Sequence, residues 1–222
     1  MTIIENEYSL PEDVKKWAED KEITVLRNRD IASVDDEYIV EYSPESSLRY
    51  LEMIYCHSKN LPAVITETER LVIKEISDKD LESYRELIEL NREVLKDSSL
   101  SGLSAGEFKI RHDAYIKYCY HFMGYGIWGI FLKDNGIKNK EMIGIAGIDG
   151  AEPVELSYAL FEKYRGLGYA YEACCAVLEM AQKDFGLEKI VLSTYETNVK
   201  SVALAKKLKK KYPFLALTIL QE

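Results

Sequence analysis

A glycine loop contains the residues whose types and spacing point most directly to chemistry in this 222-residue chain. The segment Tyr164–Ala170, centred on Arg165, Gly166 and Gly168, follows an apolar run at Val154–Phe161. A helical pattern begins immediately after it. Such a loop turns backbone N–H groups outward at a helix N-terminus, where the helix dipole favours negative charge. Because glycine has no Cβ, the backbone can also approach a ligand closely. The segment therefore predicts a phosphate or diphosphate site.

Two common nucleotide-binding loops do not match this spacing. The segment lacks the third glycine of the Rossmann loop, and it lacks the Gly-Lys-Ser/Thr ending of the P-loop. Taken alone, the residues also allow an ordinary glycine turn that joins a strand to a helix and binds nothing.

The composition indicates a globular protein, with 47% hydrophobic and 30% charged residues. Its net charge of −9 argues against a nucleic-acid partner and mildly favours cationic substrates. The four cysteines lack the spacing of metal ligands, so we expect reduced, packed thiols and no metal. Without an apolar run of about 20 residues or a signal-peptide pattern, we expect a cytoplasmic protein with no membrane partner.

Residues 1–66 predict a small α/β unit in which no motif indicates a role. We expect a helix opened by Ser43 as the N-cap and Pro44 at the first helical position. A unit of this size with few apolar positions is marginally stable by itself, so we expect it to dock on the rest of the chain. Its other expected elements are a helix at Pro11–Asp20 and strands at Ile23–Leu26, Glu37–Tyr42 and Pro62–Ile65.

Residues 67–222 predict a second series of strands and helices that positions the loop. The strand Val154–Leu160 alternates, so we expect one face to pack and the other, with Glu155, Ser157 and Ala159, to be available for chemistry. The other expected strands are Leu71–Ile76, Gly126–Leu132, Glu141–Ile148, Lys189–Thr194 and Phe214–Leu220, with a turn at Asp134–Gly136. One expected helix is capped by Ser77 or Asp78 and carries Leu81, Tyr84, Leu87, Ile88 and Val94 on one side. The other expected helices are Ala105–Phe122, Ala170–Phe185 and Asn198–Lys211.

This order of elements resembles the GNAT (Gcn5-related) N-acetyltransferase superfamily, and the glycine loop resembles its Arg/Gln-x-x-Gly-x-Gly/Ala pyrophosphate loop. Three segments resemble the RimJ/RimL-like branch: Thr68–Ile73 its opening strand, Glu155–Tyr158 its fourth strand, and Asn198–Ser201 its Asn-x-x-Ser helix start. The resemblance implies an α/β (α+β) GNAT fold for residues 67–222. That fold has a mixed, mostly antiparallel central sheet flanked by helices, here preceded by the small α/β unit.

The resemblance also implies a binding site for acetyl-CoA as the cosubstrate. Backbone groups of the fourth strand would bind the pantetheine arm and help to polarise the thioester carbonyl. Asn198 would hydrogen-bond the same arm, and Ser201 would lie beside the sulfur. The residues implied in cofactor binding are Tyr158, Ala159, Leu160, Arg165, Gly166, Leu167, Gly168, Tyr169, Ala170, Asn198 and Ser201.

Acyl transfer to an amine also needs a base. Because a free amine has a pKa of about 8 to about 10.4, it is largely protonated at neutral pH. Glu155 is our candidate, acting directly or through a water, and Ser201 is the second candidate catalytic residue because it could donate to the sulfur. The alternatives are a solvated strand carboxylate for Glu155 and a serine that caps its own helix for Ser201.

Two departures from the family pattern matter. In many members, a tyrosine seven residues after the helix-start asparagine is the acid that protonates the leaving thiolate. This chain has Ala205 at that position. The usual Lys-x-Gly-Phe turn is replaced at Lys209–Phe214, and a single strand follows. Because family members normally continue to a second C-terminal strand, we expect part of the acceptor-side wall to be missing, or to be supplied by the N-terminal unit or by a second subunit in a homodimer.

We predict an N-acetyltransferase that moves an acetyl group from acetyl-CoA to a primary amine. The amine is that of a peptide N-terminus or of a small molecule, and the residues leave this choice open. A CoA-binding module without transferase activity is the first alternative. The second is an interaction protein whose glycine loop holds no cofactor.

Overall fold

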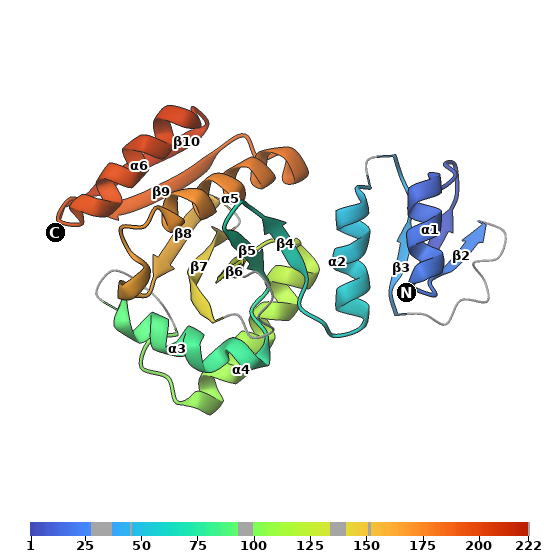
Figure 1. Cartoon of the computed structure of the whole chain (residues 1–222), viewed down its shortest axis with the longest axis horizontal. Coiled ribbons are helices and arrows are strands. Elements are labelled where there is room, and N and C mark those ends of the chain that lie inside the picture. Colours follow the sequence, from blue (N-terminus) through green and yellow to red (C-terminus); the bar gives the residue numbers. More distant parts are fainter. Residues whose placement is uncertain (28–36, 45, 93–99, 134–140, 151, 222) are drawn as a thin grey trace. The chain divides into compact units, whose positions relative to one another are not determined.

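The computed structural model of the chain describes residues 1–27, 37–44, 46–92, 100–133, 141–150 and 152–221 (Figure 1). They form two compact units, Met1–Ala63 and Val64–Glu222. Val94 and the expected turn at Asp134–Gly136 lie outside the described residues. Within the described residues, no helix is long and apolar enough to cross a membrane.

The first unit is a parallel three-stranded sheet with two helices. Its strand order is β2-β1-β3, and its core includes Ile3, Val14, Trp17, Val40 and Leu51. Its central strand β1 was not expected, because consecutive residues of it, Thr2, Ile3 and Ile4, are all buried and give no alternating pattern. The elements are β1 (Thr2–Glu5), α1 (Glu12–Asp20), β2 (Thr24–Arg27), β3 (Ile39–Glu41) and α2 (Leu48–Ser58).

The expected start of the second helix at Ser43 and Pro44 was wrong. Ser46 N donates to the Ser43 carbonyl oxygen at 2.9 Å, so these residues form a turn. Helix α2 begins at Leu48, and its N-cap is Ser47, whose Oγ accepts from Tyr50 N at 3.1 Å. Two serine-containing segments compete for the same role here, and the later one caps the helix.

The second unit is a seven-stranded sheet with the order β10-β9-β8-β7-β6-β5-β4. Its strands from β4 to β8 pair antiparallel, whereas β8 with β9 and β9 with β10 pair parallel. The strand expected at Pro62–Ile65 belongs to this sheet as β4. The strands are β4 (Val64–Glu67), β5 (Leu71–Lys74), β6 (Ile127–Leu132), β7 (Met142–Asp149), β8 (Glu155–Leu160), β9 (Ile190–Tyr195) and β10 (Leu215–Leu220).

Helices cover both faces of this sheet (Figure 1). Helices α3 (Leu81–Leu90) and α4 (Ala105–Tyr115) lie on one face, and α5 (Tyr169–Phe185) and α6 (Val199–Lys211) lie on the other. Helix α4 continues as a π-helix, η3 (Ile116–Met123), so the expected single helix changes its winding partway. The expected cap of α3 was Ser77 or Asp78, but its N-cap is Asp80; Ser77 instead caps the short 3-10 helix η2 (Asp78–Asp80) that leads into α3, and its N–H donates to Asp80 Oδ2 at 3.0 Å.

The two faces of β8 are only partly as predicted. Ala159 lies in the core cluster under α3 and α4 and is 7% exposed, so its face is not wholly available for chemistry. Glu155, on the same face at the start of the strand, is exposed. The predicted alternation of the strand was correct. The prediction that the face with Glu155, Ser157 and Ala159 is available for chemistry failed at Ala159, because the alternation of a strand does not show which helices pack on each face.

Candidate active site

Strands β8 and β9 separate directly after they meet. In the described residues, their ladder consists of the pair Glu155 with Val191, and Val191 N donates to the Val154 carbonyl oxygen at 2.9 Å. On the other side of β8, Phe161 N donates to the Ile143 carbonyl oxygen at 3.1 Å. Hydrogen bonds of an antiparallel ladder alternate along a strand. The backbone groups of residues 158 and 160 therefore face away from β7 and into a gap between the separating strands.

The glycine loop lies at the end of this exposed edge. Gly166 has φ +78° and Gly168 has φ +85°, both in the left-handed region that glycine adopts without strain. A Cβ placed on Gly166 would meet no heavy atom within 4 Å, so the loop is open on that side. Gly168 is the N-cap of α5, whose first-turn N–H groups have no acceptor inside the helix. This arrangement fits a diphosphate.

The side chain of Arg165 is held by protein groups beneath the loop. Its Nε donates to the Leu160 carbonyl oxygen at 3.0 Å, and its Nη2 donates to Asn91 Oδ1 at 2.8 Å. Asn91 is itself buried, and its Nδ2 donates to the Leu87 carbonyl oxygen at 2.7 Å. Arg165 thus ties the loop to the end of β8 and to α3, and diphosphate binding by its guanidinium stays a prediction.

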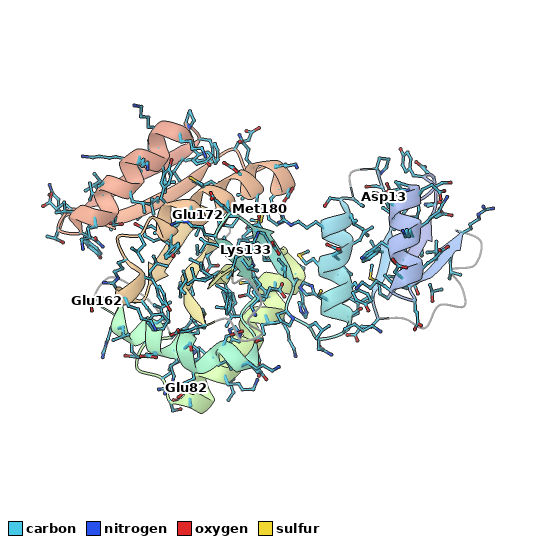
Figure 2. All side chains as sticks on the ribbon, viewed as in Figure 1. Asp13, Glu82, Lys133, Glu162, Glu172 and Met180 are labelled. Carbon is cyan, nitrogen blue, oxygen red and sulfur yellow. The ribbon has the colours of Figure 1, made fainter. Side chains whose placement is uncertain are left out.

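A second arginine clamps the loop from the other side, and the sequence interpretation missed it. Arg70 Nε donates to Glu172 Oε2 at 2.7 Å, and Arg70 Nη1 donates to the Leu167 carbonyl oxygen at 3.0 Å. The guanidinium carbon lies 4.6 Å from the centroid of the Tyr169 ring. Glu172 reaches from the first turn of α5 (Figure 2), and it also accepts from Thr68 Oγ1 at 2.5 Å. The clamp fixes the loop and the start of α5 to the turn between β4 and β5.

The Glu172 clamp makes a testable contribution to stability. Burial alone would raise the pKa of this carboxyl, but the hydrogen bonds from Thr68 and Arg70 prevail and lower it. A lowered pKa stabilises the fold above the ordinary value of 4.5, and this contribution is lost as the pH falls through the lowered value. We expect Glu172→Gln to lower the unfolding free energy by about 1 kcal/mol at pH 7, a small effect because the 43%-exposed Arg70 is screened by solvent.

Urea unfolding of both proteins between pH 3 and pH 7 measures this difference. The gap between wild type and Glu172→Gln should be constant at neutral pH and should narrow below 4.5, the ordinary value. Glu141→Gln is the control, because it removes the same charge from an ion pair with Lys163 that is more than half exposed on both sides. Equal losses in the two variants, or a gap that does not change with pH, would contradict the clamp.

At the other side of the gap, β8 and α6 meet through two hydroxyl groups. Tyr158 Oη lies 2.7 Å from Ser201 Oγ. Asn198 is the N-cap of α6, and its Oδ1 accepts from Ser201 N at 3.1 Å. Burial raises the pKa of Tyr158 to about 12, although the hydrogen bond with Ser201 opposes the rise. One helical turn after Ser201, Ala205 is fully buried and brings no polar side chain to this surface.

Most of the residues predicted for the site lie around the gap between β8 and β9. The structure brings together the edge of β8, the glycine loop, Asn198 and Ser201 around one gap. Glu155 lies at the point where β8 and β9 still pair, opposite Asp149 of β7. Because successive side chains of a strand alternate, Glu155 and Tyr158 lie on opposite faces of β8. The Tyr158 hydroxyl was missed, because the sequence interpretation assigned this residue a backbone role alone.

No group of three or more His, Cys, Asp or Glu side chains suited to a metal ion occurs among the residues described. The features that remain are a divided parallel strand pair, an exposed strand edge and a glycine loop at a helix N-terminus. Together they fit an extended ligand that carries a diphosphate, the kind of ligand that acyl-CoA transferases bind.

Comparison with known proteins identifies the family. The family model for the Acetyltransferase (GNAT) domain matches residues 70–210, and the chain belongs to this family, whose members use acetyl-CoA. The sequence resemblance and the GNAT fold predicted for this chain are thereby confirmed.

Solved structures share this fold. An acetyltransferase from Agrobacterium tumefaciens is 28% identical over 64% of this chain and 81% of its own, with a TM-score of 0.53. RimL, a ribosomal L7/L12 α-N-protein acetyltransferase in complex with coenzyme A, is 19% identical over 65% and 81%, with a TM-score of 0.51. The acetyl transferase from Salmonella typhimurium that modifies the N-terminal serine of L7/L12 is 19% identical over 65% and 82%, with a TM-score of 0.50.

Proposed function

We propose that this protein transfers the acetyl group of acetyl-CoA to a primary amine. The observation that carries the proposal is the continuity of the ligand surface. The exposed edge of β8 runs into the loop with left-handed Gly166 and Gly168, and that loop opens α5. A pantetheine arm needs strand-like N–H and C=O partners, and a diphosphate needs helix-terminal N–H groups. The surface offers both in the order in which coenzyme A carries them.

In this proposal, the backbone groups of Tyr158 and Leu160 that face the gap bind the pantetheine arm, whereas those of Ala159, between them, pair with Ile145 of β7. The N–H groups of residues 166–170 bind the diphosphate, with the loop held by Arg70 and Arg165. Asn198 uses Oδ1 to cap α6, which leaves its side-chain N–H groups to face the arm. The thioester then lies toward the point where the strands meet.

The proposed reaction is a direct transfer. Glu155, exposed at the end of the gap, takes a proton from the ammonium of the acceptor, directly or through one water. The amine nitrogen then bonds to the acetyl carbon, the carbon–sulfur bond breaks, and its electron pair goes to the sulfur. The nitrogen loses its second proton to solvent as the amide forms, and the proton on Glu155 is also released to solvent.

The acceptor in this proposal is a primary amine on a peptide N-terminus or on a small molecule. The net charge of −9 favours the approach of such cations. We place the protein in the cytoplasm, because its four cysteines are free thiols, as a reducing compartment would keep them.

A direct assay separates this function from a CoA-binding module. The purified protein is incubated with acetyl-CoA and a panel of peptides and small amines, and both thiol release and acetylated product are measured. Thermal unfolding with coenzyme A is measured in parallel, because ligand at 100 times its dissociation constant stabilises a protein by about 2.7 kcal/mol. Stabilisation without product across the panel would favour the module. Neither product nor stabilisation would refute both.

A further inference from the structure

The leaving sulfur of the proposed reaction needs a proton, and the structure places two hydroxyl groups at the gap. Tyr158 Oη and Ser201 Oγ lie 2.7 Å apart, one from β8 and one from the first turn of α6. Ser201 N already donates to Asn198 Oδ1, which fixes the serine backbone. The contact joins β8 to α6 on the side of the gap where β9 leads into α6.

The two hydroxyls differ in what they can do. A phenol is a far stronger acid than an aliphatic alcohol, so the tyrosine is the better proton donor to a thiolate. Ser201 can donate its own proton to Tyr158 Oη and thereby stabilise the phenolate that remains. Besides its burial, two groups among the described residues affect the pKa of Tyr158: the hydrogen bond with Ser201 lowers it, and the buried Cys174 thiol of α5 raises it.

We propose that Tyr158 is the catalytic acid that protonates the leaving sulfur, and that Ser201 is the positioning residue that holds its hydroxyl. The proposal rests on the proposed acetyl transfer. It assigns the proton donor to the strand residue whose backbone lines the same gap. The sequence-based expectation that Ser201 itself donates to the sulfur is thereby replaced.

The step balances in atoms and charge. The nitrogen–carbon bond forms, the carbon–sulfur bond breaks, and the sulfur keeps the electron pair. The sulfur then takes the Tyr158 Oη proton and leaves as a thiol. Tyr158 becomes a phenolate that accepts a hydrogen bond from Ser201 Oγ, and solvent returns its proton after the thiol departs. The amine nitrogen loses two protons in all: the first goes to Glu155 before the attack, and the second goes to solvent as the amide forms.

Three variants test the assignment. Tyr158→Phe should lower kcat about 100-fold or more, since a positioned acid contributes roughly 10²–10⁴-fold. Ser201→Ala should lower kcat about tenfold, which is the worth of one hydrogen bond. Tyr212→Phe is the matched control: its hydroxyl donates to Glu179 Oε1 at 2.6 Å, away from the gap, and its activity should be unchanged. The dissociation constant of coenzyme A should stay within about twofold in all three, because the phenol acts on the leaving group.

A pH profile separates acid catalysis from a structural role. A ring-fluorinated tyrosine at position 158 keeps the shape of the side chain but has a more acidic phenol. The alkaline limb of kcat should then move to lower pH, because the donor loses its proton earlier. Wild-type transfer with an undiminished Tyr158→Phe variant would overturn this assignment alone, as would an alkaline limb that does not move. Absence of transfer by the wild type would instead overturn the proposed function.

Discussion

Replacing Gly166 by aspartate is expected to weaken coenzyme A binding at least about 100-fold while the fold persists. Aspartate tolerates the left-handed region better than most residues, and a side chain at Gly166, where φ is +78°, points into open space. The backbone can therefore keep its course. The new carboxylate, however, lies where we place the diphosphate, and two like charges about 4 Å apart repel by about 4 kcal/mol at an effective dielectric constant of about 20. Isothermal titration with coenzyme A measures the loss.

Two further variants isolate the cause. Gly166→Asn has nearly the same shape without the charge, so it should retain most of the affinity. Gly186→Asp places the same charge at the other end of α5, at another glycine with positive φ and open surroundings. It should lower thermal stability slightly, because a carboxylate at a helix C-terminus opposes the helix dipole, and leave the affinity unchanged. Equal affinities for Gly166→Asp and Gly186→Asp would contradict a diphosphate at this loop.

The helix after the loop could be predicted because its signals are local. The stripe from Ala173 to Ala181 has helical spacing, and the structure buries Ala173, Val177 and Ala181 completely. Gly168 and Gly186 flank α5 as its caps, both with positive φ. Local periodicity and glycine positions were therefore sufficient for the element that presents the loop.

The clamp and the hydroxyl pair could not be predicted in the same way. Arg70 and Glu172 are 102 residues apart, and Tyr158 and Ser201 are 43 apart. Each contact depends on how elements from different parts of the chain pack against each other. The spacing of residues within one element does not show which distant element it will contact. Thr68–Ile73 was used only as a strand that resembles a family segment, although Arg70 in it proved to hold the loop. An arginine before one strand and a glutamate in the first turn of the helix after the loop were the available signal.

The same limit explains why the roles of single side chains were harder to predict than the ligand class. Arg165 occupies the family position for the diphosphate loop, yet its guanidinium donates to Leu160 and Asn91. A sequence motif records that an arginine stands at this position. It does not record whether the side chain faces the ligand or supports the loop from below, because that depends on whether a polar partner is buried beneath it. Asn91 is that partner here, and its helix lies far earlier in the chain.

Glu155→Gln is expected to lower kcat at pH 7 about 100-fold or more, because a positioned general base contributes roughly 10²–10⁴-fold. The amide has nearly the same size but cannot take a proton from the acceptor. Coenzyme A affinity should be unaffected, since the exposed carboxylate lies at the end of the gap away from the glycine loop. Glu188→Gln is the control, because it changes another exposed glutamate just before β9, at the same end of the sheet.

The pH dependence of this variant distinguishes a base from a binding group. Without Glu155, only acceptor that is already neutral can react, so the rate should rise about tenfold per pH unit below the amine pKa of about 8 for an α-amino group. Wild type gains less over this range, because Glu155 removes the proton after binding. The ratio of wild-type to variant kcat should therefore shrink as the pH approaches the amine pKa. A ratio that stays constant from pH 6 to pH 9, or a kcat equal to that of Glu188→Gln, would show that Glu155 is not the base.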